Sequence, residues 1–158
     1  MAKKVEIEQT EIEVPYELPE GWKWCRQSDV CKLTDGEKKS GTSYPYLEVK
    51  YLRGNKEKDF VTSGKFISAG TKVILVDGEN SGEVFTVPED GFMGSTFKAL
   101  SISNANEKYL QYFISTKKDL YRNNKKGSAI PHLNKELFFN MPFPLPPTLA
   151  EQQRIVSR

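Results

Sequence analysis

The residue types that could support catalysis are few in this chain. His132 is the only histidine, and Cys25 and Cys31 are the only cysteines, six positions apart and without a second histidine or cysteine at metal-ligand spacing. Zinc therefore has too few ligands, and the sequence around His132 holds no nucleophile elbow. Motifs for a phosphate-binding loop or a methyl-donor pocket are also absent from the sequence. We expect no catalytic residue, no metal and no cofactor.

One loose pattern of metal-dependent nucleases remains as an alternative. Asp35, followed later by Glu48 and Lys50, matches an arrangement in which two carboxylates hold Mg²⁺ and a lysine steadies the attacked phosphate. Asp77 and Glu79 offer further carboxylates. The pattern is unspecific because the chain holds 21 acidic residues, and Asp35 precedes a glycine as structural turn residues often do. A small Mg²⁺-dependent nuclease is therefore the second interpretation.

Polar and basic loops fit a DNA-binding surface better than an active site. Cations position a protein on phosphates, whereas amides, hydroxyls and arginine can identify base edges. The loop over residues 77–82 joins two predicted strands, where a rigid scaffold often carries binding groups. The candidate DNA-binding residues are Lys50, Arg53 and Lys56; Asn80 and Ser81; Ser95, Thr96 and Lys98; and Arg122, Asn123, Asn124, Lys125, Lys126, Ser128 and His132.

Charge is distributed unevenly, although the net charge is only +2. Residues 1–20 carry two lysines and six glutamates, a local charge of −4, so the remaining residues carry +6. Basic clusters suit a polyanion, because DNA binding draws on phosphate neutralisation and counterion release. A protein-interaction domain whose basic patches face an acidic partner is the third interpretation.

Length and composition describe one globular protein. The 158 residues are enough to bury a core, and 37% of them are hydrophobic. The sequence has no apolar run long enough for a membrane span and no signal-peptide core at its start. With only two cysteines, a secreted disulfide framework is not expected. We predict a cytoplasmic protein that does not enter a membrane.

Strand patterns dominate the first two thirds of the chain. An acidic, proline-ended lead-in covers residues 1–15, and the alternate spacing of Trp22 and Trp24 places both on one strand face. Further strands are predicted by β-branched and aromatic runs between turn residues, at 46–52, 72–76, 82–87 and 97–102.

Helical patterns follow from residue 106. Asn106 is a good N-cap, and a helix of about four turns is predicted from the 3–4 spacing of Tyr109, Leu110, Phe113, Ile114, Leu120 and Tyr121. We expect Tyr109, Phe113 and Leu120 in the core, together with Trp22 and Trp24. A short helix is expected at 134–139 and an extended, polyproline-like strap at 141–147. Thr148 and Glu151 form a capping-box pattern that opens a last helix. The predicted fold class is α+β: a twisted, mostly antiparallel sheet with a few helices and long loops, ending in the start of a truncated long helix.

Several of these stretches together match the pattern of a known family. They are Leu18-Pro19-Glu20-Gly21-Trp22-Lys23-Trp24; the strand 70–76 with the Ser81-Gly82 turn; the helix 109–121 with Gly127-Ser128 and His132-Leu133-Asn134; and, most specific, Met141-Pro142-Phe143-Pro144-Leu145-Pro146-Pro147 followed by Glu151-Gln152-Gln153-Arg154-Ile155. Over residues 16–158 the chain resembles the target recognition domains of type I restriction-modification specificity subunits.

The resemblance implies a function without catalysis in this chain. Such subunits carry two recognition domains separated by long helices, and each domain reads half of a split double-stranded DNA target. Residues 16–147 would form one recognition domain, and 148–158 the start of a truncated spacer helix. That helix would dock modification (methyltransferase) subunits and, through them, restriction subunits, and if extended it could self-associate. The implied partner-docking residues are Glu151, Gln152, Arg154 and Ile155.

Overall fold

The computed structural model describes residues 3–7, 10–126 and 131–157, and the chain divides into two compact units. Unit 1 is assembled from three separate stretches, Met1–Cys31, Ile102–Phe113 and Asn134–Arg158. Unit 2 comprises Lys32–Ser101 and Ile114–Leu133. The chain therefore leaves unit 1 twice and returns to it twice.

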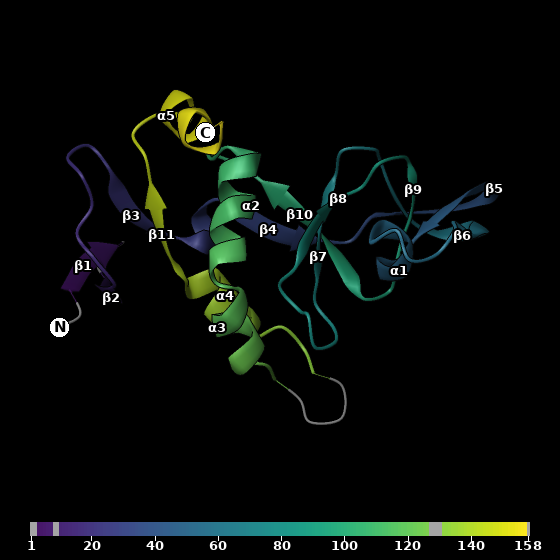
Figure 1. Ribbon diagram of the computed structural model, residues 1–158, viewed down its shortest axis with the longest axis horizontal. Helices are drawn as coiled ribbons and strands as arrows, with labels where there is room; N and C mark the ends of the chain where they lie inside the picture. The colour runs from purple at the N-terminus through teal and green to yellow at the C-terminus, as the bar shows by residue number, and fades with distance from the viewer. Residues whose placement is uncertain (1–2, 8–9, 127–130, 158) are drawn as a thin grey trace. The chain divides into compact units, whose positions relative to one another are not determined.

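Unit 1 contains two antiparallel ladders of two strands each. The lead-in forms a hairpin in which β1 (Lys3–Ile7) pairs with β2 (Thr10–Val14). β3 (Lys23–Arg26) pairs with β11 (Pro142–Leu145), and Figure 1 shows these two strands side by side. The strap is extended as predicted, but it includes a β-strand. Because Pro142 and Pro144 are two positions apart, their missing N–H groups fall on the same edge of β11, and the other edge remains able to pair.

The helices of unit 1 begin at side-chain caps. α2 (Glu107–Thr116), which runs on into unit 2, starts after Asn106, whose Oδ1 accepts a hydrogen bond of 3.0 Å from the Tyr109 amide. α4 (Lys135–Asn140) and α5 (Leu149–Val156) are capped by Asn134 and Thr148, each at 3.1 Å. The predicted helix starts are therefore confirmed, and a short 3-10 helix, η1 (Gln27–Asp29), follows β3.

The core of unit 1 is centred on Phe143 in β11. Its side chain is fully buried, and its ring meets the rings of Tyr109 and Phe113 edge-on, at centroid distances of 5.6 and 5.0 Å. The Tyr109 hydroxyl donates a 2.6 Å hydrogen bond to the carbonyl of Pro144. Strap and helix α2 are thereby held together by both apolar packing and a buried hydrogen bond.

Unit 2 is built around a four-stranded sheet. Its order is β4 (Cys31–Thr34), β10 (Phe97–Ile102), β7 (Lys72–Leu75) and β8 (Val84–Thr86), and β7 is antiparallel to both neighbours. Every residue of β7 is buried, as expected for a central strand. The predictions at 72–76, 82–87 and 97–102 are confirmed within two residues at either end.

A small barrel adjoins this sheet in the same unit. β5 (Glu37–Leu47), β6 (Phe60–Ile67) and β9 (Gly91–Met93) pair with one another around a closed circuit. A Cβ on Gly91 would lie 2.5 Å from the Pro45 carbonyl oxygen, so only glycine allows this close approach. The core cluster of unit 2 joins barrel and sheet, and contains Leu47, Ile67, Val73, Leu75, Val87, Met93, Phe97 and Ala99.

Two predicted elements differ from the structure. The strand predicted at 46–52 is wrong: β5 ends at Leu47, and α1 (Val49–Leu52) follows as a short helix. Two of its four residues, Val49 and Tyr51, are β-formers, but they pack on the core cluster with Leu52 in helical geometry, and packing outweighs this weak propensity. The predicted four-turn helix is interrupted, since α2 ends at Thr116 and α3 (Lys118–Asn123) begins after it.

The predicted core residues are only partly confirmed. Tyr109 and Phe113 are buried, as are the other apolar residues of the helical pattern, Leu110, Ile114 and Tyr121. Leu120 is not, since 40% of it is exposed, and Trp22 and Trp24 are half-buried with only Trp24 inside β3. The predicted α+β class with mostly antiparallel strands is confirmed. None of the helices in the described part of the chain is long and apolar enough to cross a membrane.

Candidate nucleic-acid interface

Three of the four predicted DNA-binding stretches meet at the end of β7, within unit 2. The Val76 amide donates to the carbonyl of Thr96 at 2.9 Å, and the Val76 carbonyl accepts from the Leu133 amide at 2.8 Å. The loop 77–82, the segment around Thr96 and the segment before Leu133 are therefore neighbours. Asp77 and His132, which belong to two of these segments, are 55 positions apart in the sequence, so the convergence is a product of the fold.

The loop 77–82 is held in one shape by its own hydrogen bonds. The Ser81 hydroxyl donates to the Gly78 carbonyl at 2.5 Å, and the Gly82 amide donates to Leu75 at 2.7 Å. Gly82 has a φ of +102°, which favours glycine, and a Cβ there would lie 3.0 Å from the Tyr121 ring. Asn80 lies in this loop with its side chain exposed. The loop is a preformed platform for that amide.

The segment after α3 is fixed against this loop. The Lys125 amine donates a hydrogen bond to the Glu79 carbonyl, and the Gly78 amide donates one to the Pro131 carbonyl at 2.8 Å. Lys126 and His132 exchange two backbone hydrogen bonds, of 3.0 and 2.7 Å. The His132 Nδ1 also lies 2.6 Å from the Asp77 carboxylate. His132 thus connects the two loops, and within the described ranges its second ring nitrogen has no hydrogen-bond partner.

The predicted residues around β7 divide into two groups by geometry. Ser81 is 4% exposed, Asn124 donates to the Leu120 carbonyl at 2.8 Å, and Lys125 holds Glu79, so these three side chains stabilise the loops. Ser128 lies outside the described residues. The exposed side chains for which the described residues offer no bonding partner are available to a ligand, and they are Asn80, Ser95, Arg122, Asn123 and Lys126.

The cluster on and after α1 is connected to the same loop. Arg53 forms an ion pair with Glu83, which directly follows the loop, and its guanidinium lies 5.8 Å from the Phe85 ring centre. Lys56 contacts Asp59 at 2.7 Å and Glu48 at 3.4 Å, which raises the pKa of the lysine. Lys50 is exposed, and no partner for its amine is found within the described chain. Of the three side chains, that of Lys50 is therefore the most available for a contact with a ligand.

The two carboxylates of the predicted nuclease pattern, Asp35 and Glu48, are held in ion pairs. The Asp35 carboxylate accepts from Lys98 at 2.6 Å and from Lys65 at 2.9 Å, and these bonds lower its pKa to about 2. Glu48 is bound to Lys56 instead. Among the residues that the structure describes, no group of three or more histidine, cysteine, aspartate or glutamate side chains is placed to hold a metal ion.

Charge differs between the two units. Unit 2 carries fifteen lysines and arginines against eleven acidic residues, a net charge of +4. The stretch Ile114–Leu133 supplies five of these cations and only one carboxylate. Unit 1 carries eight basic and ten acidic residues, a net charge of −2. Electrostatics therefore favours unit 2 as the unit that meets a polyanion.

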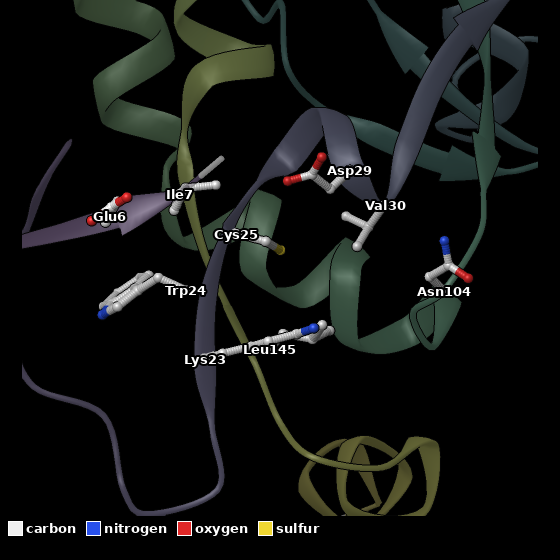
Figure 2. Close-up of a pocket in the computed structure, with 9 residues that line it drawn as sticks. All are labelled: Glu6, Ile7, Lys23, Trp24, Cys25, Asp29, Val30, Asn104 and Leu145. Atoms are coloured by element: carbon white, nitrogen blue, oxygen red, sulfur yellow. The ribbon is translucent and has the colours of Figure 1, made fainter. Parts of the chain in front are cut away.

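Unit 1 has its own surface hollow, of about 450 Å³, with different chemistry (Figure 2). Two carboxylates, those of Glu6 and Asp29, face it together with a single lysine, Lys23. Apolar side chains form the rest of its wall, and these are Ile7, Trp24, Cys25, Val30 and Leu145, with Asn104 at the rim. An excess of carboxylate disfavours a phosphate group at this hollow.

The predicted partner-docking residues lie on α5. Arg154 forms a two-bond ion pair with Glu151, at 2.8 and 2.5 Å, and Ile155 is half-buried. Gln152 is 2% exposed, and its Oε1 accepts from the Asn106 amide at 2.7 Å. Gln152 therefore attaches α5 to the start of α2, and the exposed face of α5 carries the ion pair.

Comparison with known proteins identifies the family. The sequence profile described as "Type I restriction modification DNA specificity domain" matches residues 19–158. The specificity subunit of the type I restriction enzyme MjaVIII from Methanocaldococcus jannaschii is 34% identical over 152 residues, which cover 89% of this chain and 35% of that subunit. The chain therefore belongs to the type I restriction-modification DNA specificity domain family, and it spans about a third of the length of this relative.

Solved structures show the same fold. A chain from a study of complex assembly and conformational transition of the type I R-M system superposes with a TM-score of 0.69 at 24% identity, over 90% of this chain and 38% of that one. The HsdS subunit of Thermoanaerobacter tengcongensis gives 0.65 at 24% identity, over 90% and 37%. The S subunit from M. genitalium gives 0.60 at 17% identity, over 90% and 39%.

Proposed function

We propose that this chain is a target recognition domain that reads one half of a split double-stranded DNA target, with no catalysis of its own. The observation that carries the proposal is the convergence of three predicted DNA-binding stretches at the end of β7, in the unit with a net charge of +4. Family membership supports the same function. Correct recognition would direct partner methyltransferase and endonuclease subunits to that DNA.

We assign phosphate contacts and base contacts to different residues of this surface. Lys126 and Arg122 are exposed cations beside the fixed loop, and they set the register on the phosphate backbone. Asn80 presents its amide from the loop 77–82 and can form two hydrogen bonds to an adenine edge in the major groove. Because the loops are already fixed by hydrogen bonds, little ordering entropy is lost on binding.

The remaining assignments complete the proposal. Residues 16–147 form the recognition domain, and 148–158 begin a spacer helix whose exposed Glu151–Arg154 face docks modification subunits and, through them, restriction subunits, or a second copy when extended. Both cysteines are free and buried, which raises the pKa of each thiol to about 12. Inert thiols of this kind suit a reducing cytoplasm.

The proposal is tested by selection from random duplex DNA at low salt, with Mg²⁺ present and then absent, followed by sequencing of the bound pool. We expect enrichment of one short motif and intact DNA in both conditions. Cleavage that depends on Mg²⁺ would establish the nuclease interpretation instead. Absence of any enrichment would favour a protein-interaction domain that uses its basic surface on an acidic partner.

Lys126→Ala is expected to weaken binding equally on matched and unmatched duplexes. Removal of one phosphate contact lowers the slope of log affinity against log salt by about 1, because one condensed counterion fewer is released. Fluorescence anisotropy across a salt series measures this slope. Lys108→Ala removes the same charge from an exposed position of α2 in unit 1 and serves as the control. Equal slopes for the two variants would remove Lys126 from the interface.

A further inference from the structure

The ribbon formed by β5 and β6 presents a polar face that none of the predicted sites includes. In the antiparallel register, Lys38 lies opposite Lys65 and Ser40 lies opposite Ser63. Side chains two positions apart on a strand point to the same side of the sheet, so these four residues share one face. Two amines and two hydroxyls therefore form a compact square, which we call the ribbon tetrad: Lys38, Ser40, Ser63 and Lys65.

The opposite face of the ribbon is anchored in the barrel. Phe66 and Phe92 meet edge-on at 6.4 Å, and Tyr44 packs on both rings at 5.0 and 5.5 Å. A Cβ on Gly64 would lie 3.1 Å from the Phe92 side chain, so glycine lets the two approach closely. Lys39 belongs to this face, where its amine lies 4.2 Å from the centre of the Phe66 ring. This packing fixes which side chains of the ribbon point outward.

The four tetrad residues, together with Lys39 and Gly64, line an open hollow of about 450 Å³ on the surface of unit 2. Lys38, Ser40 and Ser63 are exposed there, and the Lys65 side chain is 41% exposed. Figure 1 shows β5 and β6 running together as a two-stranded ribbon. A ribbon of this kind has the width that the major groove of duplex DNA admits.

The charges of the tetrad are incompletely neutralised. Like charges directly opposite in a ladder destabilise it, and Lys38 faces Lys65 in this way. Lys65 shares the Asp35 carboxylate with Lys98, at 2.9 and 2.6 Å, so three lysines including Lys38 are balanced by one carboxylate. No ion pair of Lys38 is found in the described part of the chain. An anion in the hollow would relieve this repulsion and accept hydrogen bonds from Ser40 and Ser63.

We propose that the ribbon tetrad holds a backbone phosphate of duplex DNA and is a second contact surface beside the loops at the end of β7. The inference rests on the proposed function, since it names a further part of unit 2 that meets the same DNA. Lysine amines and serine hydroxyls are among the groups that contact phosphates in protein–DNA complexes. Lys98 connects this surface to the predicted DNA-binding residues, because its amine binds the same Asp35 carboxylate as Lys65.

A lysine away from the hollow provides the matched control. Lys38→Ala and Lys108→Ala each remove one positive charge from an exposed position, but only Lys38 lines the hollow. Affinity for a duplex with the selected motif and for a scrambled duplex is measured over a salt series. Lys38→Ala is expected to lower the salt slope by about 1 on both duplexes, whereas Lys108→Ala retains the wild-type slope. Equal slopes in the two variants would overturn the assignment.

Backbone amide resonances of the wild-type chain, titrated with the same duplexes, separate this inference from the proposed function. Shifts at residues 38–40 and 63–65 are expected together with shifts in the loop 77–82. Shifts in the loop alone would overturn the ribbon tetrad and leave the proposed function standing. Shifts in the ribbon without any motif selection would support the tetrad and overturn the proposed function. If neither the ribbon nor the loop 77–82 shows any shift, both the ribbon tetrad and the proposed function are overturned.

Discussion

Asn80→Ala is expected to abolish discrimination at one base pair of the target and to leave binding to unrelated DNA unchanged. Asn80 lies exposed in a loop whose shape is set by the Ser81 and Gly82 hydrogen bonds, so its truncation leaves the platform intact. A bidentate amide–adenine contact contributes about 1–3 kcal/mol of discrimination. That free energy corresponds to about 5- to 150-fold in relative affinity.

The measurement is a comparison of selected motifs for the wild type and the variant, followed by affinities for duplexes that differ at the relaxed position. Asn140→Ala provides the control, because it removes an exposed amide from the last residue of α4 in unit 1. We expect the control to select the wild-type motif. An unchanged motif for Asn80→Ala would show that this side chain does not identify a base.

Phe143→Ala is expected to lower the free energy of unfolding of unit 1 by about 3–5 kcal/mol, the usual cost of removing a buried aromatic ring. The ring is fully buried between Tyr109 and Phe113, and its strand is one half of the β3–β11 ladder. Urea unfolding followed by tryptophan fluorescence is a selective measurement. Trp22 and Trp24 are the only two tryptophans, and both belong to unit 1.

Phe60→Ala is the matched control for this loss, since the same ring is removed from a position that is 61% exposed. Surface substitutions of this kind usually change the free energy of unfolding by about 0.5 kcal/mol or less. A shift of the tryptophan transition by Phe143→Ala no larger than that of Phe60→Ala would contradict the central place given to the β11 strap.

Local patterns predicted some elements closely and missed others for identifiable reasons. β10 has the predicted bounds, because Phe97, Ala99 and Leu100 supply buried apolar residues in a strand-forming run. β5 was missed over most of its length, since its first seven residues are all exposed and only pairing with β6 defines them as a strand. The helix α1 contains β-formers, and it is helical because of contacts made by residues distant in sequence.

The candidate site was predictable in its residue types and not in its geometry. The amide and cations of the loops at 80 and 122–126 are visible in the sequence. Their attachment through Val76, and the internal role of Ser81, require the fold. The ribbon tetrad was not predicted, because Lys38 and Lys65 are neighbours only in the register of two strands. Register is set by barrel packing, and short-range patterns do not contain it.

Because β3 pairs with β11, the segment between these two strands can change in length with little effect on unit 1. Arg26 lies opposite Pro142, so more than a hundred residues, including the whole of unit 2, lie between two paired strands of unit 1. The entropy of closing such a segment grows only with the logarithm of its length, and ten residues inserted into it would cost about 0.1 kcal/mol in closure. Insertions in the loops of unit 2 therefore leave unit 1 nearly undisturbed. Evolution can lengthen and replace the surfaces that we propose to face DNA while the scaffold of unit 1 stays unchanged.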